Sequence, residues 1–204
     1  MVLIEGISLL ASVLTTVAPA MQVVHILRTR SVEGLSVLTG IVLVIGASLS
    51  LLLGIQYQLG AVLILMSLSL FFQALMLHLV SWRVSLLVWA IILGSVLLVA
   101  VFLPRFGADM LSTRYTQQVA FVWGLIAATT FFPQLITTRR TRQTRDLSLI
   151  TLLCFAAGMS LWTVFAWLVQ NWSLLLWSAI ITVSVYELLR LKLTIKPPAS
   201  AVLG

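Results

Sequence analysis

A proline and a glutamine stand side by side in Thr129-Thr130-Phe131-Phe132-Pro133-Gln134-Leu135, a segment whose other residues are apolar or threonine. The segment runs into a cationic stretch at 139–145. The same pattern occurs 112 residues earlier, and the alignment of the two copies continues without a gap to Gln58 and Gln170. We therefore interpret the chain as a tandem duplication. Identical residues at the start of the alignment are Gln22, Arg28, Thr29, Arg30, Leu35, Ser36 and Thr39, which match Gln134, Arg140, Thr141, Arg142, Leu147, Ser148 and Thr151.

The composition predicts a polytopic membrane protein. Hydrophobic residues make up 61% of the 204-residue chain, charged residues 8%, and the mean hydropathy is +1.17. A soluble domain of this size would expose much of that apolar surface to water. A membrane-spanning helix needs about 20 apolar residues, so we expect an all-α membrane protein with seven transmembrane helices. The segments lie near residues 4–27, 36–55, 58–79, 84–103, 115–138, 148–169 and 172–191.

The positive charges predict the orientation of these segments. Of the 12 lysines and arginines, only Arg105 and Arg114 fall on the outer side when the N-terminus is placed outside. Cytoplasmic loops of membrane proteins carry an excess of such residues, so we expect an outer N-terminus and a cytoplasmic C-terminus. The inner loops and tail then hold Arg28, Arg30, Arg83, Arg139, Arg140, Arg142, Arg145, Arg190, Lys192 and Lys196. Ten arginines against two lysines point to a GC-rich bacterial source and hence to a bacterial inner membrane.

Several function classes are disfavoured by the sequence. No nucleophile–base set, metal-ligand cluster or phosphate-binding loop is present, so we expect no enzyme activity, cofactor or metal. The net charge of +7 is explained by membrane topology, and we expect no nucleic-acid partner. A single cysteine, Cys154, excludes a disulfide within the chain. The expected partners are a small-molecule solute and the lipid bilayer, with a homo-oligomer left open.

Local patterns in both copies predict how the helices begin and pack. Ser36 and Ser148 each follow a basic loop and are expected to cap the next helix through their hydroxyl groups. Gly46-Ala47-Ser48 is matched by Gly158-Met159-Ser160, and the small residues in these segments allow membrane helices to approach closely. His25 and the hydroxyl groups of the first segment are expected to have structural roles.

The paired motifs resemble those of the PQ-loop family, which includes cystinosin-like amino-acid exporters, SWEET sugar facilitators and relatives of the KDEL receptor. The resemblance covers roughly residues 2–192. Pro133-Gln134 matches the family motif, whereas in the first copy Pro19 comes three residues before Gln22 and Met21 stands at the proline position. The resemblance implies two parallel three-helix bundles, at residues 1–82 and 114–204, joined by a spacer helix and outer loop at 83–113. The spacer is also required by geometry, because three crossings alone would invert the second copy.

The resemblance further implies a transporter of a small polar solute, of the amino-acid or sugar class, that works by alternating access between the two bundles. Prolines remove a backbone donor, and in lipid the carbonyl left without its usual partner needs another one. Pro19 and Pro133 are therefore predicted hinges, with Thr15 and Thr129 carrying the freed carbonyls. Threonine hydroxyls beside each break are expected to satisfy them.

Candidate solute contacts come from the positions that line the path in SWEET-like members. The second copy offers Trp162 and Ser178, and the first copy Ser50 and Met66 at the matching positions. Asparagines typical of the sugar site are missing. The remaining polar candidates along the predicted pathway are Gln22, Gln134 and Thr182.

Glu187 leaves two interpretations open. A carboxylate inside a membrane helix is costly and is often functional, so Glu187 is a candidate for coupling transport to protons. It is also close enough to Arg190 and Lys192 to form an ion pair at the membrane surface. Facilitated diffusion and proton coupling thus remain alternatives. The alternative function classes are a membrane receptor or sorting protein and a lipid-handling accessory protein of the same fold.

Overall fold

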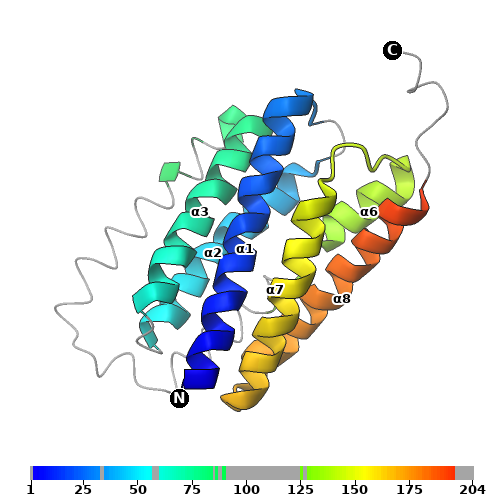
Figure 1. Cartoon of the computed structure of the whole chain (residues 1–204). Helices are drawn as coiled ribbons and strands as arrows, with labels where there is room; N and C mark the ends of the chain where they lie inside the picture. Colours follow the sequence, from blue (N-terminus) through cyan, green and yellow to red (C-terminus); the bar gives the residue numbers. More distant parts are fainter. Residues whose placement is uncertain are drawn as a thin grey trace.

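The computed structural model describes residues 2–32, 35–56, 60–84, 86, 89–90, 125 and 128–195 of the chain. Every element within these ranges is helical, which confirms the all-α class (Figure 1). The predicted spacer at 83–113 and the first part of the predicted helix at 115–138 fall almost entirely outside the described residues. The helices are α1 (Val2–Thr29), α2 (Val37–Gln56), α3 (Gly60–Val80), α6 (Phe132–Thr141), α7 (Leu149–Leu168) and α8 (Trp172–Thr194).

Four described stretches are long and apolar enough to cross a membrane: Leu3–Thr29, Leu63–Val80, Leu149–Leu168 and Trp172–Thr194. Within α2, a shorter apolar stretch covers Val37–Ser48. Large apolar side chains point outward from these helices, with Ile64 72% and Trp167 72% exposed. Contiguous apolar surface of this kind is typical of a face that contacts lipid. The described helices are therefore consistent with an α-helical membrane protein, while the number of crossings and their orientation stay predictions.

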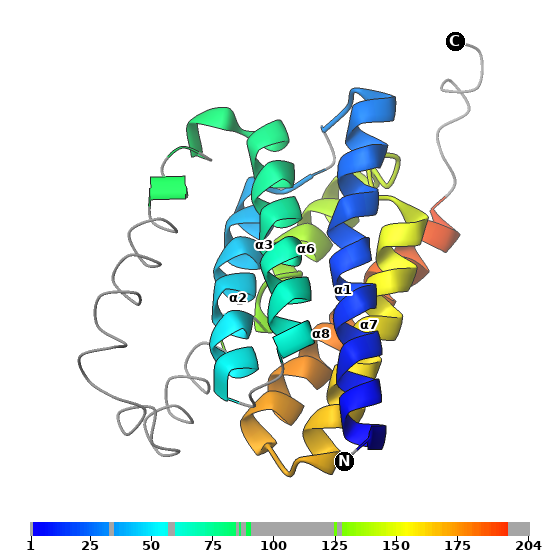
Figure 2. The ribbon, with the colours of Figure 1, turned by 60° about the vertical axis from the view of Figure 1, so that its left-hand side comes forward.

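The helix packing follows the internal repeat. In the first copy α1 and α2 both pack on α3, and in the second copy α6 and α7 both pack on α8. Between the copies α1 packs on α7, and α6 makes the corresponding, smaller contact with α2. Figures 1 and 2 show that the two copies run in the same direction, because the loops that lead into α2 and α7 lie at the same end of the molecule. We call this the loop end.

The same backbone conformation ends α1 and α6, the first helix of each copy. Arg30 follows α1 with φ 52° and Arg142 follows α6 with φ 55°, and these two residues are counterparts in the repeat. A left-handed residue commonly closes a helix, although glycine adopts that conformation at lower cost. The two copies thus share the left-handed backbone conformation at the start of each basic loop.

Gly158 sets the spacing between α1 and α7. A Cβ atom at this position would lie 2.8 Å from Thr15 Cγ2 and 3.1 Å from Leu14 Cβ, both on α1. It would also lie 3.2 Å from the backbone nitrogen of Thr15. The expected close helix approach is confirmed at this residue, since only glycine leaves room for the α1 backbone.

We predict that Gly158→Ala lowers the free energy of unfolding by about 1–3 kcal/mol, the usual cost of overpacking a close contact. The matched control is Gly6→Ala, because a Cβ at Gly6 in α1 meets no atom within 4 Å. That substitution should be neutral or stabilise by up to about 1 kcal/mol through helix propensity. Thermal unfolding in detergent, followed by tryptophan fluorescence, measures both. Equal melting temperatures for the two variants would contradict the close α1–α7 contact.

Candidate functional site

The glutamine of the first motif binds the start of α7. Gln22 Nε2 donates a hydrogen bond to the backbone oxygen of Asp146 at 2.7 Å, and its Oε1 accepts one from the backbone N–H of Ser148 at 3.1 Å. Both bonds are buried. Ser148 is the capping residue of α7, with its Oγ accepting from Thr151 N–H at 3.3 Å. A side chain of the first copy therefore holds the helix cap of the second.

The glutamine of the second motif makes the converse contact. Gln134 Oε1 accepts a hydrogen bond from the backbone N–H of Ser36 at 2.9 Å, and its Nε2 donates to Thr138 Oγ1 at 3.3 Å. Ser36 Oγ in turn accepts from Thr39 N–H at 3.3 Å, so it caps α2 as expected. We call the contacts between the copies, those of Gln22 with Asp146 and Ser148 and that of Gln134 with Ser36, the glutamine brackets. They join the two copies at the loop end in a nearly symmetric way.

A cavity of about 50 Å³ lies beside the glutamine brackets. Its walls come from both copies, and most lining residues have their repeat counterpart in the lining as well. The site is predominantly apolar, with the glutamine amides and a few hydroxyl groups as its polar points. The lining residues are Pro19, Gln22, Leu35, Ser36, Thr39, Gly40, Leu43, Met76, Leu77, Val80, Phe131, Gln134, Leu147, Thr151, Leu152, Phe155 and Leu188.

The carbonyl freed by Pro19 is satisfied from a neighbouring helix. Pro19 lies inside the continuous helix α1, and the backbone oxygen of Thr15 accepts a hydrogen bond from Ser69 Oγ on α3 at 3.3 Å. Gln73 Nε2 donates to the same Ser69 Oγ at 3.1 Å. The expectation that threonines beside the break would supply this bond is wrong for α1, because Thr16 Oγ1 instead donates to the backbone oxygen of Leu65 at 2.8 Å.

Pro133 has a different structural role from Pro19. It lies in the first turn of α6, after a turn at residues 129–131. The helix predicted over 115–138 is therefore not continuous, because residues 125 and 128 are helical and α6 begins only at Phe132. The backbone oxygen of Thr129 accepts from Phe132 N–H at 3.1 Å. Proline is favoured at the start of a helix, where its missing N–H has no helical partner to lose. The hinge predicted at Pro133 is thus a helix break.

The predicted solute contacts of the second copy lie elsewhere in the structure. Trp162 is 7% exposed, and its ring packs edge to face on Phe165 with centroids 5.2 Å apart. Thr163 Oγ1 on α7 lies 3.2 Å from Ser178 Oγ and 3.4 Å from Thr182 Oγ1 on α8. Ser178 and Thr182 therefore belong to a cluster of hydroxyl groups between α7 and α8.

The structure does not bring this cluster or Trp162 to the motif glutamines. Gln22 contacts Ser148 at the start of α7, and Trp162 lies 14 residues further along this helix, a rise of about 21 Å at 1.5 Å per residue. Gln134 contacts Ser36 at the start of α2, which lies at the same loop end. Met66 is buried in the same apolar core as Trp162. Ser50 lies in α2, and its side chain is outside the described part of the chain.

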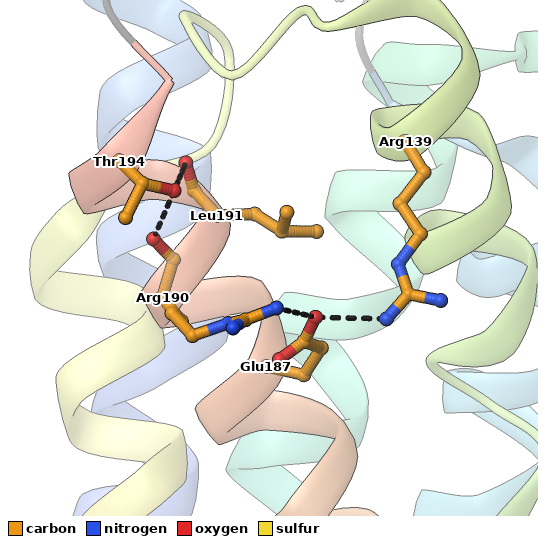
Figure 3. A network of polar contacts seen from close by, with 5 residues as sticks. All are labelled: Arg139, Glu187, Arg190, Leu191 and Thr194. Carbon is orange, nitrogen blue, oxygen red and sulfur yellow. Dashed lines mark hydrogen bonds and ion pairs between the residues drawn. The ribbon is translucent and has the colours of Figure 1, made fainter.

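Glu187 forms ion pairs at the loop end. Its Oε1 accepts from Arg139 Nη2 and from Arg190 Nη2, each at 2.8 Å, so it connects α6 with α8 (Figure 3). The predicted pair with Arg190 is confirmed, whereas Lys192 Nζ donates to the backbone oxygen of Thr144 at 2.6 Å. Both arginine side chains are more than half exposed. Exposed ion pairs contribute little to stability, and this one positions α6 against α8.

Further contacts hold the second basic loop and were not predicted from the sequence. His25 Nε2 lies 3.2 Å from the backbone oxygen of Arg145, and Lys192 reaches Thr144 from α8. Both partners are backbone atoms, which carry no sequence signal. The identity of Gln22 and Gln134 in the two copies was the one available indication of the glutamine brackets.

The described residues contain no group of three or more histidine, cysteine, aspartate or glutamate side chains that could hold a metal ion. Comparison of the chain with protein-family models, with curated proteins and with solved structures found no match. The site is therefore described by its geometry alone. It is a hydrogen-bonded contact between the two copies of the repeat at the loop end.

We predict that Gln22→Leu destabilises the protein, because it removes the hydrogen bonds of two buried backbone groups at a cost of about 1–3 kcal/mol each. Gln143→Leu is the matched control, since Gln143 is an exposed glutamine in the loop that Gln22 contacts. Thermal unfolding should show a clear loss for Gln22→Leu and little change for the control. A loss of the same size in both variants would show that the brackets do not stabilise the fold.

Proposed function

We propose that this chain is a membrane transporter that moves a small polar solute, of the amino-acid or sugar class, by alternating access between its two copies. In this proposal the copies are parallel three-helix bundles of the PQ-loop type, joined by a spacer helix in a 3+1+3 arrangement. The N-terminus lies outside and the loop end faces the cytoplasm. The observation that supports the proposal is the pair of glutamine brackets, which joins the two copies at the loop end.

The chemistry of the brackets suits a closure that must open repeatedly. Each bracket consists of neutral hydrogen bonds between a side-chain amide and backbone groups at a helix start. When such groups separate at a hydrated end, water can replace the lost partners, so the net cost per bond is only about 0.5–1.5 kcal/mol. The α6–α8 ion pair of Glu187 can stay intact during this motion, because both helices belong to the second copy.

The prolines supply the points at which the brackets can move. Pro19 precedes Gln22 by less than one helical turn, and Pro133 is adjacent to Gln134. A helix bends with less strain where a backbone hydrogen bond is missing, and α6 already follows a turn at residues 129–131. Bending at these positions would carry each glutamine away from the opposite cap.

The solute is proposed to contact Trp162 and the hydroxyl groups of Ser178 and Thr182 when the copies separate. These groups offer a flat apolar face and several hydrogen-bonding positions, which is the usual composition of a small-molecule site. The exposed ion pairs of Glu187 support facilitated diffusion over proton coupling, since two arginines favour its charged form.

Uptake into proteoliposomes tests the function directly. We expect saturable uptake of at least one solute from a panel of amino acids, sugars and small organic cations. The double variant Gln22→Leu/Gln134→Leu should transport more slowly, because its inner closure is weakened, whereas Gln143→Leu should transport at the wild-type rate. If correctly folded protein transports no solute of the panel, the transporter proposal is wrong. The receptor or sorting protein and the lipid-handling accessory protein are then the favoured classes.

Substitution of Pro133 distinguishes a moving break from static packing. Pro133→Ala restores an N–H that can help the helix continue through residues 129–131. One added helical hydrogen bond, worth about 0.5–1.5 kcal/mol, would slow exchange between states by about 3- to 10-fold if it stabilises only one of them. We expect a lower transport rate together with an equal or higher melting temperature. Pro19→Ala should show a milder effect, because Ser69 already supports the Thr15 carbonyl. A wild-type rate for Pro133→Ala would contradict the gating role.

A further inference from the structure

Two buried threonine hydroxyls occupy equivalent positions in the two copies. Thr39 is 6% exposed and Thr151 is 7% exposed, and each lies three residues after the serine that caps its helix. Among the described residues, neither Thr39 Oγ1 nor Thr151 Oγ1 has a hydrogen-bond partner. A buried hydroxyl without a hydrogen-bond partner is costly. Because Thr39 and Thr151 are equivalent in the repeat, one explanation should account for both hydroxyls.

Both hydroxyls belong to residues that line the cavity beside the glutamine brackets. The cavity volume of about 50 Å³ exceeds the roughly 10–15 Å³ that a single water molecule requires. Gln22 also lines the cavity, and its amide oxygen, which accepts one hydrogen bond from Ser148, has a second lone pair. The lining therefore contains polar groups of the kind to which a buried water molecule makes hydrogen bonds.

The lining also defines the charge of the guest. None of the lining residues is charged. The cavity adjoins the N-terminal ends of α2 and α7, where the helix dipole disfavours a cation. An anion would be buried without a positive partner, which is costly, and the N–H groups of Ser36 and Ser148 already donate to the glutamines. Thr39 and Thr151 can both donate and accept, so the fitting guest is a small neutral molecule that does the same.

We propose that this cavity is a binding site for water, held by the hydroxyl groups of Thr39 and Thr151. The bound water satisfies both hydroxyls and makes the contact between the two copies a hydrated joint. The proposal rests on the closed arrangement of the copies and does not depend on transport. It therefore stands or falls separately from the proposed function.

Replacement of the hydroxyls by a methyl group of similar size gives the first test. For a site that holds water, the double variant Thr39→Val/Thr151→Val loses the hydrogen bonds to the guest, and the melting temperature should fall by about 2–4 °C or more. For a cavity without water, the same change removes two unsatisfied hydroxyls and should raise the melting temperature. The double variant Thr39→Ser/Thr151→Ser keeps the hydroxyl groups and serves as the matched control for the water-dependent signal below. An unchanged or higher melting temperature in the valine variant overturns the proposal.

Radiolytic labelling of methionine tests the site in the unmodified protein. Hydroxyl radicals produced from bound water oxidise the side chains next to it. Met76 lines the cavity and is 9% exposed, whereas Met66 and Met159 are 8% and 5% exposed and do not line it. We expect Met76 to be oxidised several-fold faster than Met66 and Met159. The difference should persist in the serine variant and vanish in the valine variant. Equal oxidation of the three methionines in the wild-type protein overturns the proposal even if the variants do not fold.

Discussion

The structure depends on the need to satisfy backbone groups at the starts of two helices. The N–H of a capping residue has no partner inside its own helix, and a buried polar group without one is costly. Here the partner comes from the opposite copy, since Gln22 accepts from Ser148 and Gln134 accepts from Ser36. Each copy therefore supplies a hydrogen-bond partner for a helix start of the other copy. These same bonds hold the two copies together at the loop end.

The two copies accommodate their prolines differently, because the prolines stand at different positions of the repeat. Ser69 on α3 donates to the carbonyl that Pro19 leaves open, and α1 remains continuous. Pro133 stands at the repeat position of Met21, two residues later than Pro19, so the carbonyl that it concerns is that of Thr129, the counterpart of Val17. In the second copy the chain instead makes a turn at residues 129–131 and starts a new helix at Phe132. The shifted position of the proline thus accompanies a continuous helix in one copy and an interrupted helix in the other.

The interactions at the loop end are individually weak and of two kinds. Neutral hydrogen bonds join the two copies, whereas the ion pairs of Glu187 with Arg139 and Arg190 stay within the second copy. Gly158 adds a close contact between α1 and α7. At the loop end, ion pairs therefore connect helices within the second copy. Hydrogen bonds that water can replace join this copy to the first. Such a joint can separate without breaking either copy.

The sequence by itself determined the helical class, the membrane environment, the duplication and the serine caps, because periodicity, hydropathy and repeated residues are local properties of the chain. It also singled out Gln22, Gln134 and Glu187. Only the tertiary structure decided what these residues contact. The brackets and the Lys192 contact end on backbone oxygen and nitrogen atoms, which are the same in every residue and leave no sequence pattern. The carbonyl freed by Pro19 is likewise satisfied by a hydroxyl from a helix distant in sequence.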